Sequence, residues 1–154
     1  MYNRPIVPAG FIVPDGLETP GFRLRPLTVH DLVRDYDAVM SSAVVLKGRM
    51  AADGSWPDGL TLEENLIDLG WHQREFTIRH SFAYTVVSLD GARCLGCCYI
   101  YPSSDPAFDS VALYWARESR IGDAADLELG NAFRGWLARD WPFRRVAFPG
   151  RETT

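Results

Sequence analysis

The chain of 154 residues is 47% hydrophobic and 23% charged, which is the composition of one ordinary globular domain. Its formal net charge of −4 argues against nucleic acid as the main partner, because phosphate binding needs a basic surface. The sequence has no run of about 18 apolar residues that could span a membrane and no secretion signal at its start, so we expect a cytoplasmic protein.

Residues 1–20 contain four prolines and little periodicity. They are either an arm that docks as an extended segment or edge strand, or a disordered tail. The alternation of apolar and basic side chains over residues 22–27 then predicts a half-buried strand.

Two capping boxes predict the starts of two helices, one at Thr28 and one at Thr61. The loop between these helices, residues 48–59, is long enough to be functional, and its Trp56 either contributes to that function or anchors the loop on the core. The expected buried stripes are Leu32, Val33, Tyr36, Val39 and Met40 in the first helix, and Leu62, Leu66, Leu69 and Phe76 in the second.

Three strands follow. Residues 82–89 are β-branched and aromatic, Asp90-Gly91 predicts a two-residue hairpin turn, and residues 94–101 form the return strand. Residues 110–116 are the third strand. Because these strands are apolar on both faces, we expect a sheet covered by helices on both sides, an α/β (α+β) fold.

The three cysteines all lie in the strand over residues 94–101. Cys94 and Cys97 have the spacing of a redox or metal pair, but an odd separation on a strand predicts opposite faces, with Cys94 and Cys98 together on one of them. No second pair follows at zinc spacing, so we interpret all three as packing residues and expect no metal.

Residues 117–124 form a loop around Gly122, and a helix follows to about Asp140. Free amides at a helix N-terminus favour an anion, and Arg117 and Arg120 could add positive charge. The acidic residues Asp123, Asp126 and Glu128 would repel a phosphate and can stabilise the helix by themselves. Both an anion site and a self-capped helix therefore remain open. Residues 144–148 predict a further strand, and residues 149–154 a tail.

The hairpin, the third strand, and the loop and helix after it resemble the core of the GNAT N-acetyltransferase superfamily. In that family the loop reads Arg or Gln, two residues, Gly, one residue, and Gly or Ala. The segment from Ser119 to Ala124 keeps the Gly as Gly122 and the Ala as Ala124, with Ser119 at the first position. The resemblance, which also covers the strand and helix after Phe22, implies one domain with a mixed, mainly antiparallel sheet, in which strand 144–148 runs parallel to strand 110–116 and splays from it.

The resemblance also implies an acyl-CoA-dependent N-acyltransferase that transfers an acetyl group to a small-molecule or peptide amine. The implied contacts to acetyl-CoA, or to another acyl-CoA, are Trp115, Ala116, Arg117, Arg120, Ile121, Gly122, Asp123 and Ala124. Candidate bases are Glu118, Asp109 and His72, and candidate acids are Tyr99, Tyr101 and Tyr114. The alternative is a non-catalytic GNAT-like module that binds a ligand or protein. The family usually continues past this last strand, so we expect a homodimer that covers the open sheet edge.

Overall fold

The computed structural model describes residues 3–50 and 54–151, so parts of the predicted arm, loop and tail (1–2, 51–53 and 152–154) lie outside the described residues. The chain folds around one six-stranded sheet whose strands neighbour one another in sequence order. All neighbouring strands are antiparallel except the last pair, which is parallel. The strands are β1 (Leu17–Glu18), β2 (Arg23–Pro26), β3 (Phe82–Val87), β4 (Cys94–Tyr101), β5 (Ser110–Ala116) and β6 (Val146–Ala147).

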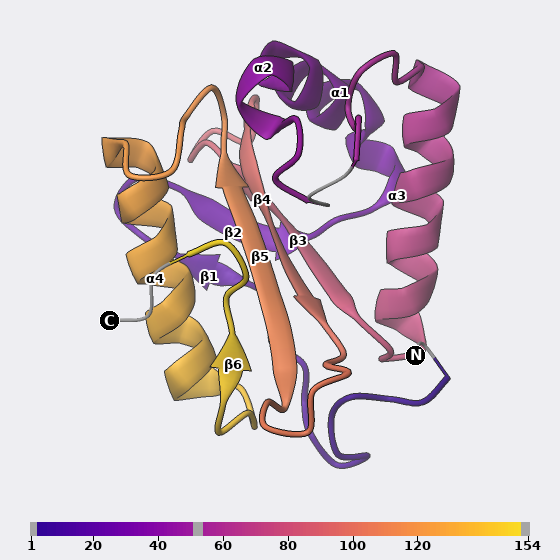
Figure 1. Ribbon diagram of the computed structural model, residues 1–154, viewed down its shortest axis with the longest axis vertical. Helices are drawn as coiled ribbons and strands as arrows, with labels where there is room; N and C mark the ends of the chain where they lie inside the picture. The colour runs from indigo at the N-terminus through magenta and orange to yellow at the C-terminus, as the bar shows by residue number, and fades with distance from the viewer. Residues whose placement is uncertain (1–2, 51–53, 152–154) are drawn as a thin grey trace.

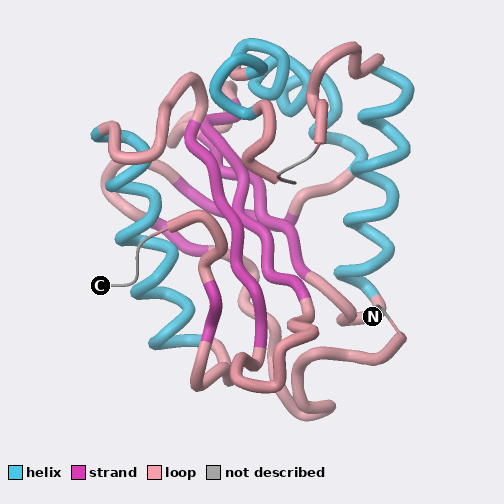
Figure 2. The backbone as a smooth tube through the Cα atoms, viewed as in Figure 1, coloured by secondary structure: helices cyan, strands magenta, loops and turns pink. Residues whose placement is uncertain are grey.

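Helices cover both faces of the sheet, as the two-sided apolar strands predicted (Figures 1 and 2). One face carries the short helix η1 (Val29–Asp31), α1 (Leu32–Ser41), α2 (Ala43–Leu46) and α3 (Leu62–Thr77), and the other face carries α4 (Ala124–Asp140). No helix in the described ranges is long and apolar enough to cross a membrane.

The described part of the N-terminal arm docks on the domain as an extended segment, which confirms one of the two alternatives. The amide of Ile6 donates to the carbonyl of Arg79 at 3.0 Å, and the Tyr84 hydroxyl donates to the Pro14 carbonyl at 2.6 Å. Val7 is buried in the same core as Trp136 of α4. The arm therefore closes the α4 side of the sheet and ends in the edge strand β1.

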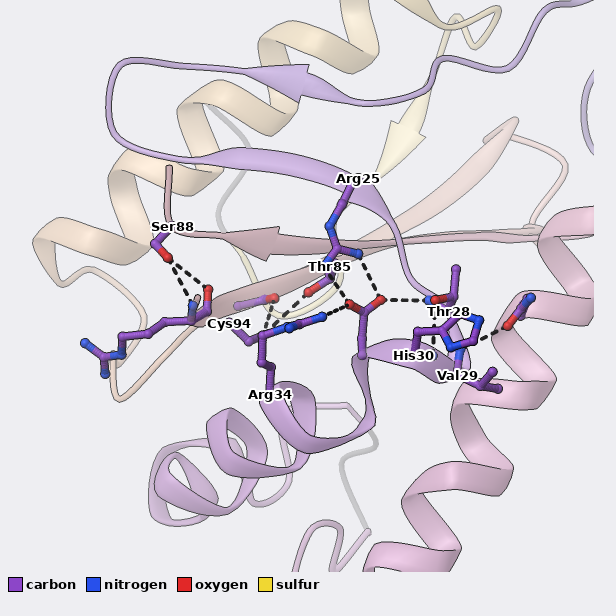
Figure 3. Close-up of polar contacts among 12 residues, drawn as sticks. Arg25, Thr28, Val29, His30, Arg34, Thr85, Ser88 and Cys94 are labelled. Carbon is purple, nitrogen blue, oxygen red and sulfur yellow. Dashed lines mark hydrogen bonds and ion pairs between the residues drawn. The ribbon is translucent and has the colours of Figure 1, made fainter. Parts of the chain in front are cut away.

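Both predicted capping boxes are present. Thr28 and Asp31 exchange side-chain and backbone hydrogen bonds at the start of η1, and Thr61 and Glu64 do so at the start of α3. Figure 3 shows Arg25 of β2 and Arg34 of α1 converging near Thr28; their guanidinium groups bind the buried Asp31 carboxylate at 2.6 and 3.2 Å. This ion pair network fixes how the first helix leaves the sheet.

The buried stripes of α1 and α3 differ from the predicted ones. Val33 is 75% exposed, and Leu62 and Leu66 are 46% and 40% exposed, whereas Asp35 and Asn65 are buried. The Asn65 amide donates to an Asp35 carboxylate oxygen at 2.9 Å, so this pair satisfies part of its own hydrogen bonding in the interior. Each helix is rotated so that it buries a polar residue where an apolar one was expected.

Two details of the hairpin also correct the predictions. Six residues, 88–93, join β3 to β4. The Ser88 amide donates to the Arg93 carbonyl at 3.0 Å, so four residues lie inside this closing bond, and Gly91 among them has a positive φ of 74°. A bulge near Gly96 shifts the register, so that Cys94 packs on the same face as Cys97, and not with Cys98. A Cβ at Gly96 would lie 2.2 Å from the Trp115 carbonyl oxygen, which explains why glycine stands at the bulge. All three cysteines are free and buried.

Candidate functional site

The parallel pairing of β5 and β6 is short, and the two strands then separate. Only Ser110 with Val146 and Val111 with Ala147 are paired. Pro149 follows shortly after and cannot donate a ladder hydrogen bond. Beyond this point lies a cavity of about 190 Å³, which we call the strand cleft, lined by Gly48, Arg49, Met50, Leu113, Tyr114, Ile121, Pro149, Gly150 and Arg151.

The Gly122 loop lies at one end of the strand cleft, and two of its amides are already bonded. The Gly122 amide donates to the Asp126 carboxylate at 3.0 Å, and the Arg120 amide donates to Asp123 at 2.8 Å. The amides of Ala124 and Ala125 have no acceptor among the residues that the structure describes. The start of α4 is therefore partly self-capped and partly open.

Two arginines that the sequence analysis did not select reach this loop from other parts of the chain. Arg151 forms a bidentate salt bridge with Asp126, with both hydrogen bonds 2.9 Å long. It also donates to the Tyr114 carbonyl at 2.9 Å. Arg49 donates to the Ser119 carbonyl at 3.0 Å and lies 3.5 Å from Asp126. Burial raises the pKa of Asp126, but the bonds from Arg151 and the Gly122 amide outweigh it, so its net pKa is below the usual value.

The residues predicted to contact a cofactor divide into two groups. Ile121, Gly122 and Ala124 lie at the strand cleft or at the open start of α4, with Arg120 and Asp123 in the same loop. Arg117 instead binds Asp37 of α1 at 2.8 Å, so its charge is directed away from the loop amides. Ala116 and Trp115 are buried in β5, Trp115 on the face that carries α1–α3.

A second cavity, of about 110 Å³, lies between α1, α3 and β4. We call it the helix pocket. It brings together the predicted His72, Tyr99, Tyr101 and Trp56. The sequence analysis missed the polar residues beside them. The full lining is Leu27, Asp35, Val39, Met50, Trp56, Asn65, Asp68, Leu69, His72, Tyr99 and Tyr101.

Burial controls the charges of the helix pocket. It raises the pKa of Asp35 to about 6, although Asn65 partly opposes this, and the carboxylates of Asp31 and Asp68 raise it further. Burial lowers the pKa of His72 to about 4. At neutral pH, Asp35 is thus ionised without a basic partner among the described residues, and His72 is neutral.

The helix pocket and the strand cleft are neighbours. Met50 lines both cavities, and Tyr99 of the pocket pairs across the sheet with Leu113 of the cleft. The Trp115 indole donates to the Tyr99 hydroxyl at 3.1 Å, which fixes that ring from the next strand. A group held in one cavity is therefore close to a group held in the other.

The remaining candidates lie elsewhere. Asp109, at the opposite end of β5, accepts from the amides of Arg144 and Arg145. Glu118 lines a separate cavity of about 320 Å³ with Gly21 and Ala125, and lies at neither the strand cleft nor the helix pocket. The Tyr114 hydroxyl packs against Gly130 of α4, although its ring borders the strand cleft.

No family model matches this sequence, and no curated protein does. Solved structures do match. They include RimL, a ribosomal L7/L12 alpha-N-protein acetyltransferase (TM-score 0.67, 17% identity, 92% of this chain and 75% of that chain). RimJ of Mycobacterium smegmatis, solved with CoA-disulfide, gives a TM-score of 0.64 at 15% identity over 84% of this chain and 64% of that chain.

A ribosomal-protein-S5-alanine acetyltransferase from Vibrio fischeri is similar as well, with a TM-score of 0.61 at 15% identity over 79% of this chain and 66% of that chain. The chain thus spans between 64% and 75% of the length of these three proteins. At such identities the likeness establishes the fold, and it is the fold that the hairpin, loop and helix predicted.

Proposed function

We propose, on the premise that the chain has the fold of the GNAT N-acetyltransferases, that the protein is an acyl-CoA-dependent N-acyltransferase. The observation that carries this proposal is the strand cleft, where β5 and β6 separate beside the open start of α4. A solved neighbour of the same fold, the RimJ structure, contains a coenzyme A derivative, which supports this choice of cofactor. The bound thioester would supply the activated acyl group.

The residues of the cleft fit such a cofactor. The amides of Ala124 and Ala125, at the positive end of the α4 dipole, suit a pyrophosphate, and Gly122 lets the backbone come close. Arg49 and Arg151 place two positive charges beside them. Backbone groups of β5 beyond Val111, which have no strand partner in β6, would hold the extended arm of the cofactor; the Tyr114 carbonyl among them already accepts from Arg151.

The proposed acceptor is an amine, free or in a peptide. Two neighbours, RimL and the Vibrio fischeri protein, are acetyltransferases of ribosomal proteins, which supports a protein or peptide amine. A cytoplasmic location remains part of the proposal.

Asp126 supports a second candidate function, a non-catalytic module that binds a ligand or protein. Its carboxylate occupies the Gly122 amide and holds Arg151 across the cleft. A carboxylate about 6 Å from a phosphate charge costs about 3 kcal/mol at an effective dielectric of 20. The transferase proposal therefore requires that Arg49 and Arg151 offset this repulsion.

Binding of acetyl-CoA separates the two candidates. With acetyl-CoA at a thousand times its dissociation constant, the free energy of unfolding should rise by about 4 kcal/mol, seen as a higher melting temperature. Ala124→Glu should weaken binding at least tenfold by placing a negative charge at the start of α4. The control Ala138→Glu makes the same change at the exposed far end of that helix and should leave binding within about twofold. Absence of any shift with acetyl-, propionyl- and succinyl-CoA would favour the non-catalytic module.

A further inference from the structure

The helix pocket contains a buried carboxylate that lacks a counterion. Asp35 is 4% exposed, and Asn65 donates to one of its oxygens at 2.9 Å. No described residue donates to the other oxygen, and no described basic side chain pairs with the carboxylate. Asp68 adds a second acid to the lining of the pocket. An ionised buried carboxylate without a cation is unfavourable, so the pocket is suited to a ligand that brings a positive charge.

Aromatic rings form another part of the pocket wall. Tyr99 and Tyr101 are stacked with centroids 5.8 Å apart, His72 lies 5.4 Å from Tyr99, and Trp56 borders the same space. The faces of such rings attract a cation as well as the apolar part of an alkyl chain. His72 is neutral at pH 7, so it does not repel a positive ligand.

The volume limits the size of the ligand. The helix pocket is a small cavity of about 110 Å³. That space accepts an ammonium group and the first carbons of an alkyl chain, and a larger molecule would have to leave the rest of itself outside. The pocket adjoins the strand cleft through Met50 and the Tyr99–Leu113 pair.

We infer that the helix pocket binds a primary alkylammonium group, with the Asp35 carboxylate as its counterion and the rings of Trp56, Tyr99 and Tyr101 around its alkyl chain. Binding at this pocket stands on the geometry alone. That the bound amine is the acceptor of acyl transfer rests on the proposed function.

As an acceptor, the ammonium must first release one proton, through the pocket to solvent. The nitrogen lone pair then forms the N–C bond to the acyl carbon as the C–S bond breaks. The coenzyme A thiolate takes the second proton from the nitrogen of the adduct, which leaves an amide and a thiol. The reaction as a whole releases one proton for each alkylammonium consumed.

The test measures binding of n-butylammonium chloride to the whole protein by titration calorimetry at pH 7.5, without acyl-CoA. We expect saturable binding, no comparable binding of n-butanol, and at least a tenfold weaker affinity for the isosteric variant Asp35→Asn. The control Glu63→Gln removes an exposed acid at the start of α3 and should bind as the parent does. Equal binding of butanol, or equal affinity of Asp35→Asn and the parent, would overturn the inference.

Two peptides identify the source of the ammonium. One carries a single lysine between blocked termini, and the other has a free N-terminus and no lysine. Asp35-dependent binding of either peptide or of butylammonium supports the site, and binding of none of the three overturns it. Failure of acetyl-CoA to bind, with the ammonium still bound, would remove the proposed transferase and leave the ammonium site in place.

Melting curves guard against a purely structural explanation. Because Asp35 is buried as an unpaired anion at pH 7.5, Asp35→Asn should keep or raise the melting temperature while it weakens ammonium binding. A lower melting temperature together with lost binding would indicate a structural role for Asp35 and would count against the inference.

Discussion

Asp126 has two opposing effects at the start of α4. It neutralises Arg151 and Arg49 and accepts from the Gly122 amide, all of which stabilise the loop. The same negative charge is unfavourable beside a phosphate. One buried side chain, 1% exposed, therefore stabilises the loop and opposes the proposed binding of a phosphate there.

Asp126→Asn should separate these effects. We expect a loss of about 3 kcal/mol in the free energy of unfolding, because two arginines lose their buried counterion. We also expect acetyl-CoA to bind about a hundredfold more tightly, because the repulsion of about 3 kcal/mol is gone. Chemical denaturation and calorimetry measure the two quantities. The control Glu128→Gln removes a negative charge from the same helix without contacting Arg151. An unchanged affinity for acetyl-CoA in the folded Asp126→Asn protein would show that the Asp126 carboxylate does not border the phosphate site.

At the scale of single residues, the sequence predicted several residues of the site but not which residues lie beside them. His72, Tyr99, Tyr101 and Trp56 were selected one by one, and only the fold brings them to one pocket. Asp35 was missed although it carried a signal. It lies three residues after Leu32 and four before Val39, and thus interrupts an apolar stripe at helical spacing. Arg49 and Arg151 carried no such signal, because their contacts with Asp126 span distant parts of the chain.

Among the elements, α4 is the one whose distance from the sheet depends on a single small residue. A Cβ at Gly130 would lie 2.4 Å from the Tyr114 hydroxyl of β5. A Cβ at Gly135 would meet only the flexible end of Arg139, at 3.6 Å. Of these two glycines, only Gly130 is needed for the close approach of α4 to the sheet.

The two glycine-to-alanine variants should therefore change the free energy of unfolding in opposite directions. Gly135→Ala should raise the free energy of unfolding by up to about 1 kcal/mol through helix propensity. Gly130→Ala gains the same propensity but forces Tyr114 to move, which costs about 1–3 kcal/mol, so we expect a net loss. Urea denaturation of both variants measures the difference, and equal stabilisation by the two would contradict the close packing of α4 on Tyr114.

The strands were predicted more accurately than the helix faces, for physical reasons. Turn residues and prolines delimit β4 and β5, so the predicted bounds of both were correct. Gly96 inside the strand pattern is consistent with a bulge, but the register shift that the bulge produces could not be predicted from the alternation of side chains, which is why Cys94 was placed on the wrong face. The rotations of α1 and α3 could not be predicted either, because they depend on the hydrogen bond between Asp35 and Asn65 of two different helices.

For the molecule as a whole, the helix pocket links stability to pH through two groups of opposite effect. The folded pKa of Asp35 is about 6 against an ordinary value of 3.8, so the folded state takes up the proton first and stability falls as pH rises from about 4 to 6. The folded pKa of His72 is about 4 against 6.5, so the unfolded state takes up the proton first and stability falls as pH drops from about 6.5 to 4. Each difference of two or more pH units is worth about 3 kcal/mol, and the two nearly cancel.

Variants at these two positions should show how each group alone changes the free energy of unfolding with pH. The free energy of unfolding of Asp35→Asn should fall by about 3 kcal/mol as the pH drops from 6.5 to 4, because only the effect of His72 remains. The free energy of unfolding of His72→Gln should rise by about as much over the same range. Thermal melts at half-unit pH steps, compared with the parent, measure both. Parallel curves for the two variants would contradict this assignment of charges. Asp31, Asp68 and Tyr99 face the same pair and are unchanged in both variants.

The homodimer stays a prediction. Both edge strands, β1 and β6, have only two residues, which offers little backbone for pairing between copies of the chain. A dimer would therefore need side-chain contacts beyond the sheet edge. Light scattering after size exclusion should give the mass of two chains, and a single-chain mass at all concentrations would remove the prediction.

The bulge at Gly96 distributes the three cysteines so that their alkylation can report which part of the molecule unfolds first. Because it turns Cys94 toward Cys97, two thiols lie beneath α1–α3 and one, Cys98, lies beneath α4. Burial raises the pKa of all three, so a maleimide or iodoacetamide should leave the folded chain unmodified. Brief alkylation followed by intact-mass spectrometry would then distinguish three events by adduct number. One adduct would mark lifting of the α4 layer, two would mark lifting of the opposite layer, and three would mark global unfolding.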